Sequence, residues 1–161
     1  MDIEQAKKEI RSAYEQRAAM YYHIFVELRE EVGQDRAVAI MRAAIYRRGV
    51  ETGEKYHAAA ARGDFEEIGR IFCAGSAAGG ELFEPSVAEV GEEGVVLKMT
   101  ACPLLDSWRK LGVAPEELDL MCAIAAAVDE GTYEGAGLAF SFRERLGQPG
   151  ATACLLDIRK R

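Results

Sequence analysis

The chain lacks the short motifs that would assign a function class at once. It has no G-x-G-x-x-G or Walker phosphate-binding loop, no H-E-x-x-H zinc motif and no G-x-S-x-G nucleophile motif. The sequence therefore carries no motif that indicates nucleotide binding, metalloprotease chemistry or serine-hydrolase chemistry. Histidine is scarce as well, so His23 and His57 are the only imidazoles that a catalytic site could use.

Positive charge and long apolar runs are also in short supply. Lys and Arg total 20 against 27 Asp and Glu, which gives a net charge of -7 and makes nucleic-acid or anionic-membrane binding unfavourable. The apolar run Leu118 to Val128 carries Asp119 and is too short to span a bilayer. The opening Met1-Asp2-Ile3-Glu4 is charged, unlike a signal peptide. We expect a cytoplasmic protein with no nucleic-acid or membrane partner. Its oligomeric state, a homo-oligomer included, is left open.

The cysteines of the chain form no closely spaced motif. Cys73, Cys102, Cys122 and Cys154 are far apart and form no Cys-x-x-Cys pair. In a cytoplasmic protein they should be reduced thiols rather than disulfides.

Helical periodicity dominates the first half of the chain. Apolar residues recur at intervals of three and four from residue 2 to 32, where Gly33 ends the first predicted helix. A second helix is predicted over 35–61, where Gly49 and Gly53 lie one turn apart and indicate close backbone packing or a kink. With a third helix over 65–73, these segments form a predicted helical half, 1–75.

The second half, 80–161, mixes strands and helices. The pattern predicts strands at 85–90, 95–101, 138–143 and 152–158, and helices at 103–112 and 115–129. We therefore predict an α+β fold: the N-terminal helical half packs on a C-terminal ββααββ unit with a four-stranded antiparallel sheet, within one compact domain. The first helix is expected to dock on that sheet.

Cys102 stands where a strand ends and a helix begins. Pro103 suits the first helical position, which makes Cys102 the predicted N-cap. A sulfur there faces unpaired backbone N–H groups and the positive end of the helix dipole, conditions that lower a thiol pKa. Packing of Cys102 as a small buried hydrophobe is an equal alternative.

Three further residues could join Cys102. Cys122 and Asp129 are seven residues apart on the helix predicted at 115–129, so they should share a face. Cys154 falls on the apolar face of the last strand. Core packing is the simpler interpretation of Cys122 and Cys154 taken singly. Because a cysteine enzyme needs a nearby base, His23 on the first helix is the preferred imidazole.

The run Thr100-Ala101-Cys102-Pro103-Leu104-Leu105, followed by Cys122, Asp129 and Cys154, resembles the L-2-amino-thiazoline-4-carboxylic acid hydrolase family. The strand Phe140-Ser141-Phe142-Arg143 and the two long N-terminal helices extend the resemblance over most of the chain.

The resemblance implies a hydrolase acting on non-peptide C–N bonds, without a cofactor. Its small-molecule substrate would be a cyclic amidine such as 2-amino-thiazoline-4-carboxylate, opened to N-carbamoyl-cysteine. Cys102 would be the nucleophile, Asp129 the acid that pairs with the amidinium and Arg143 the clamp for the substrate carboxylate. His23 would serve as the base, and Cys122 and Cys154 would line the substrate site.

Two other classes stay open. Cys102, Cys122 and Cys154, with Asp129 or His23 as a fourth ligand, could hold zinc or an iron–sulfur cluster. Alternatively, the chain is a non-catalytic interaction module in which the cysteines only pack. Metal analysis identifies the first alternative, and thiol reactivity separates an enzyme from the second.

Overall fold

A computed structural model gives the fold of residues 2–161; Met1, the first residue of the predicted helical half, lies outside the described residues. The N-terminal half consists of α1 (Ile3–Val32), α2 (Gln34–Gly53), η1 (Glu54–Tyr56), α3 (His57–Arg62), α4 (Phe65–Ala74) and η2 (Ala77–Gly80). The C-terminal half consists of β1 (Pro85–Gly91), β2 (Gly94–Met99), α5 (Pro103–Lys110), α6 (Pro115–Ala125), α7 (Ala127–Gly135), β3 (Ala139–Glu144) and β4 (Cys154–Arg159).

The four strands form one open sheet in the order β1-β2-β4-β3, and each neighbouring pair is antiparallel. The predicted α+β class and the four-stranded antiparallel sheet are therefore confirmed. Leu97 of β2 faces Leu156 of β4, which in turn faces Phe142 of β3. This register gathers apolar side chains on one face, as the alternation in the sequence predicts.

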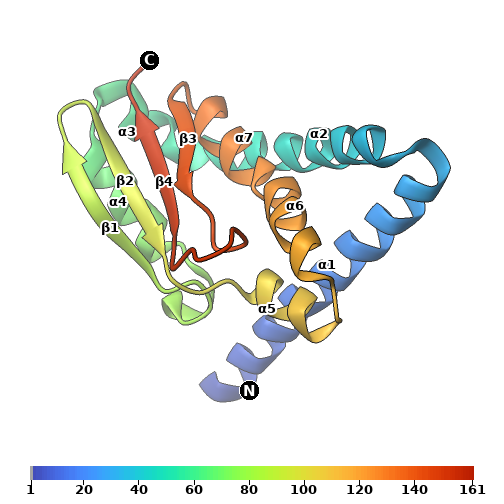
Figure 1. Ribbon diagram of the computed structural model, residues 1–161. Coiled ribbons are helices and arrows are strands. Elements are labelled where there is room, and N and C mark those ends of the chain that lie inside the picture. The colour runs from blue at the N-terminus through green and yellow to red at the C-terminus, as the bar shows by residue number, and fades with distance from the viewer. Residues whose placement is uncertain (1) are drawn as a thin grey trace.

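The long arms α1 and α2 meet at Gly33, whose φ of 80° suits glycine. Figure 1 shows α5 and α6 between these arms, with the sheet on the other side of the molecule. Helix α1 packs on α5 and α2, whereas α4 covers β1 and β2 and α7 contacts β3. The expected docking of α1 on the sheet is wrong because α5 and α2 occupy its apolar face. The indole Nε1 of Trp108 in α5 donates to Ala18 O at 2.8 Å, which fixes that contact.

The apolar core has two parts. One lies among α1, α2, α5 and α6 around Phe25, Trp108 and Met121. The other lies between the sheet and helices α4 and α7, around Ile68 and Tyr133. The partition of the chain into halves at 75–80 stays a prediction.

The helix predicted at 115–129 is two helices. Its first part, α6, ends at Ala125, and α7 begins at Ala127 and continues to Gly135. Cys122 and Asp129 therefore belong to different helices, and the prediction that they share one helix is wrong. Gly131 lies inside α7, where it makes a close contact with α2. The helix predicted at 35–61 is likewise interrupted, at η1.

Glycines bring α2 and α7 into backbone contact. A Cβ on Gly49 would lie 2.2 Å from Val128 O, and one on Gly131 would lie 2.1 Å from Tyr46 O. Thr132 Oγ1 donates to Val128 O at 2.7 Å and approaches Gly49 O at 3.2 Å. The close packing predicted from Gly49 is confirmed, and it fixes the first turn of α7, where Asp129 lies.

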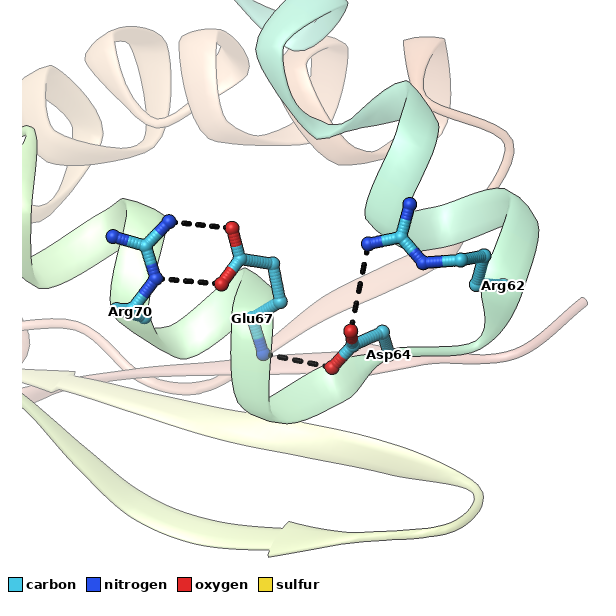
Figure 2. Close-up of polar contacts among 4 residues, drawn as sticks. All are labelled: Arg62, Asp64, Glu67 and Arg70. Carbon is cyan, nitrogen blue, oxygen red and sulfur yellow. Dashed lines mark hydrogen bonds and ion pairs between the residues drawn. The ribbon is translucent and has the colours of Figure 1, made fainter.

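Surface ion pairs mark the corner between α3 and α4 (Figure 2). Asp64 caps α4 by accepting from Glu67 N at 3.0 Å, and Arg70 forms two hydrogen bonds with the Glu67 carboxylate. Arg62 approaches Asp64 at 3.5 Å. These exposed pairs contribute little to stability, as is usual on a surface. Across residues 2–161, no helix combines the length and apolarity needed to cross a membrane.

Candidate active site

A cavity of about 390 Å³ lies between the helical arms and the ends of the strands. Cys102, Cys122, Asp129 and Cys154 all line it, so the four residues that the sequence singled out converge on one space. They come from four elements: the α5 N-cap, α6, α7 and β4. This volume falls within the range of about 300–1,000 Å³ that is typical of small-molecule sites.

Cys102 is the N-cap of α5, and Pro103 follows it at the first helical position, as predicted. The backbone N–H groups of Leu104 and Leu105 lower the pKa of its thiol, although neither reaches hydrogen-bond geometry with the sulfur. Burial is the larger effect, and the nearby charges of Asp106 and Asp129 add to it, so the pKa of Cys102 is raised. The expected depressed pKa is therefore wrong, because desolvation of a thiolate outweighs the helix N-terminus.

Cys122 and Cys154 form the neighbouring wall. Burial, reinforced by the surrounding thiols, raises the pKa of Cys122 to about 12 and that of Cys154 to about 11. Cys154 Sγ also accepts a hydrogen bond from Leu146 N at 3.3 Å. Both side chains are thiols at neutral pH and offer a polarisable, weakly polar surface to a ligand.

Asp129 is the one acidic residue among the cavity-lining residues of the 2–161 range. Within that range its carboxyl group makes no ion pair, and its side chain takes part in none of the hydrogen bonds. Burial, with a smaller effect from the charge of Glu130, raises the pKa of Asp129 to about 7. At neutral pH such a carboxyl group can both donate and accept a proton.

Two tyrosines flank Asp129 and were not predicted. Tyr56 and Tyr133 line the cavity with ring centroids 5.2 Å apart, and Tyr133 stacks on Phe140. Burial is the main cause that raises the pKa of Tyr56 to about 12 and that of Tyr133 well above its ordinary value. Both hydroxyl groups are thus protonated hydrogen-bond donors. Tyr133 lies one helical turn after Asp129, a signal that was missed because the helix was expected to end at residue 129.

Arg143 is not among the residues that line the cavity. It pairs with Glu89 and Asp157, each at 2.8 Å, across the strands β1, β3 and β4. Arg145 lines the cavity instead, where it pairs with Asp119 at 2.8 Å. Its buried Nε has no hydrogen-bond partner among the described residues. A register shift between Phe142 and Glu144 changes the direction of the chain here, so strand alternation could not have identified Arg145.

Neither histidine lines the cavity. His23 is exposed on α1 and borders a shallow apolar groove with Ile24, Glu27, Leu28 and Glu31. His57 is exposed at the start of α3. In the 2–161 range, no three His, Cys, Asp or Glu side chains are arranged to hold a metal ion. The geometry thus provides no support for the zinc or iron–sulfur alternative there.

Three exposed cations complete the lining: Arg17 of α1, Arg48 of α2 and Lys55 of η1. No sequence motif joins them, because they are scattered over two helices and a turn. Their exposure places them where the cavity meets solvent, while Asp129 and Arg145 are more enclosed.

A family model described as L-2-amino-thiazoline-4-carboxylic acid hydrolase matches residues 12–156. Comparisons with curated proteins and with solved structures give no significant match. The match spans nearly the whole chain, including every residue that lines the cavity. The chain therefore belongs to the L-2-amino-thiazoline-4-carboxylic acid hydrolase family.

Proposed function

We propose that this protein hydrolyses a cyclic amidine carboxylate of the 2-amino-thiazoline-4-carboxylate type, with Cys102 as nucleophile and Asp129 as acid and base. The observation that carries the proposal is the convergence of Cys102 and Asp129 on one cavity. Family membership supports the reaction class. The raised pKa of Asp129, about 7, supports a role in proton transfer at neutral pH.

The Asp129 carboxylate and the Cys102 thiolate destabilise each other until substrate binds. The charge of Asp129 raises the pKa of Cys102, so a carboxylate and a thiolate together are disfavoured in the free protein. An amidinium placed between them reverses this effect, because a cation stabilises both anions. Substrate binding therefore lowers the pKa of the Cys102 thiol and forms the nucleophile where it is needed.

The bond that opens follows from the product. N-carbamoyl-cysteine retains both amidine nitrogens on the former ring carbon, so the ring C–S bond breaks rather than the C–N bond named from the resemblance. Asp129 takes the Cys102 thiol proton as Sγ adds to the amidine carbon, the ring C–S bond breaks and the leaving sulfur takes that proton from Asp129. Water then gives a proton to Asp129 and adds to the same carbon. As Cys102 Sγ leaves that carbon it takes up the proton of the new hydroxyl group, which forms the urea carbonyl, and Asp129 returns its proton to solvent.

Arg145 is the proposed clamp for the substrate carboxylate, in place of Arg143. Its unpartnered Nε can donate to a carboxylate oxygen, and its guanidinium is held by Asp119. Arg143 already forms ion pairs with the carboxylates of Glu89 and Asp157 on the sheet. The protonated hydroxyls of Tyr56 and Tyr133 can donate hydrogen bonds beside Asp129.

The test is turnover of 2-amino-thiazoline-4-carboxylate with two product readouts, a free thiol and a free primary amine. C–S cleavage releases a thiol, whereas C–N cleavage releases an amine. We expect thiol release by the wild type and loss of at least about 100-fold in Cys102→Ser and Asp129→Asn, the scale typical of acid–base residues. Cys73→Ser is the matched control, because Cys73 lies on α4 and does not line the cavity. Full activity of Cys102→Ser would end the nucleophile assignment.

A further inference from the structure

The cavity mouth carries more positive charge than the proposed substrate can neutralise. Arg17, Arg48 and Lys55 line it at the surface, and Arg145 lies deeper with Asp129. The protein as a whole has a net charge of -7, so this group of cations opposes the overall balance. A charged cleft in such a setting raises the local concentration of ligands of opposite sign.

Two of these cations are held by aromatic rings rather than by carboxylates. The Arg17 guanidinium lies 4.3 Å from the Tyr14 ring centroid, and the Lys55 ammonium lies 5.1 Å from that of Tyr56. Neither forms an ion pair with a residue in the 2–161 range. Arg48, by contrast, pairs with Glu51 at 3.0 Å. Aromatic contacts orient a cation while leaving its hydrogen-bond donors free.

Glycine provides room for one of them at the rim. A Cβ on Gly75 would lie 3.2 Å from Lys55 Nζ, so the ammonium lies against the segment that follows α4. Gly75, Ser76 and Ala77 line the cavity beside it. The Lys55 ammonium therefore lies close to other residues of the cavity lining.

We propose that the natural substrate carries a second anionic group, bound by Arg17 and Lys55, in addition to the carboxylate held by Arg145. This inference rests on the proposed function and deepens it by naming the substrate class: a cyclic amidine with two acidic substituents. The volume of about 390 Å³ leaves space for a larger molecule than the small ring and single carboxylate of 2-amino-thiazoline-4-carboxylate.

Binding of two ring-stable analogues tests this without requiring turnover. Isothermal titration calorimetry would compare 2-aminothiazole-4-carboxylate, a monoanion, with 2-aminothiazole-4,5-dicarboxylate, a dianion. We expect the wild type to bind the dianion about tenfold more tightly, as two charge-assisted contacts to partly solvated cations allow. This preference should fall with added salt.

Variants assign the preference to residues. Arg17→Met and Lys55→Met should each reduce the ratio of the two affinities several-fold, and the double variant should bring it close to one. Arg70→Met is the control of equal charge, because Arg70 is exposed on α4 and pairs with Glu67 outside the cavity (Figure 2). Equal binding of both analogues by the wild type, or a ratio that survives in the double variant, would overturn the inference. Failure of the proposed function is distinct: the binding preference would persist with no hydrolysis of the thiazoline.

Discussion

Replacement of Asp129 by asparagine should make the protein more stable at alkaline pH while it removes activity. The folded-state pKa of Asp129, about 7, lies above its ordinary value of 3.8 because burial disfavours the carboxylate. Because this pKa is raised, the contribution of the Asp129 carboxyl group to folding stability is complete below about pH 4 and is lost as pH rises through 7. Ionisation inside the folded protein then costs on the order of 4 kcal/mol by pH 8. An asparagine side chain cannot ionise, so the Asp129→Asn variant avoids that loss.

The assay is urea unfolding followed by fluorescence of Trp108, which is the single tryptophan and is fully buried. The quantity of interest is the difference in unfolding free energy between variant and wild type, measured at pH 4 and at pH 8. From pH 4 to pH 8 this difference should grow in favour of Asp129→Asn by several kcal/mol. Any effect of the amide on stability that does not depend on pH is the same at both pH values and therefore cancels. Cys73→Ser should show no such growth, because burial raises the pKa of Cys73 above its ordinary value and the thiol stays neutral at both pH values. A pH-independent difference for Asp129→Asn would refute the buried-carboxyl argument.

Three further outcomes follow from the packing and the site. Gly49→Ala should destabilise the fold by about 1–3 kcal/mol in urea unfolding, because its Cβ would overlap Val128 O, while Gly91→Ala has open space and serves as control; equal effects would contradict the helix contact. Arg145→Met should raise KM for the thiazoline carboxylate about tenfold or more in steady-state kinetics. Arg143→Met should leave KM within about twofold, because Arg143 forms ion pairs with Glu89 and Asp157 on the sheet. The reverse order would restore Arg143 as the clamp. Alkylation at pH 7 with peptide mapping should modify Cys73 before Cys122 and Cys154, whose pKa values of about 12 and 11 keep them as enclosed thiols; faster labelling of Cys122 than of Cys73 would contradict this order.

The strand pattern and the Cys102-Pro103 junction were predictable because they are local. Alternation of Leu138, Phe140 and Phe142 reflects the period of a half-buried strand, and proline at the first helical position fixes the helix start. The antiparallel sheet and the N-cap of α5 follow from these signals. The convergence of Cys102 and Asp129 agrees with the resemblance, although no local pattern shows it.

The remaining features depend on tertiary contacts that a sequence does not display. Gly131 resembles a helix end, but the approach of α2 requires it inside α7. Arg143 resembles a clamp for the substrate carboxylate from its position on a strand. The register shift after Phe142 places Arg145 in the cavity instead. The raised pKa of the Cys102 thiol could not be predicted from the sequence, because helix-terminus effects are local, whereas desolvation depends on everything packed around the sulfur.

Covalent trapping tests the central claim most directly. During steady-state turnover of 2-amino-thiazoline-4-carboxylate, an acid quench followed by peptide mass mapping should find the amidine carbon and its substituents attached to Cys102. The Asp129→Asn variant should form less of this adduct than the wild type or hydrolyse it more slowly. The Cys73→Ser variant should form it as the wild type does. Hydrolysis that proceeds at full rate in Cys102→Ser, with no mass added to Cys102 in the wild type, would contradict the account.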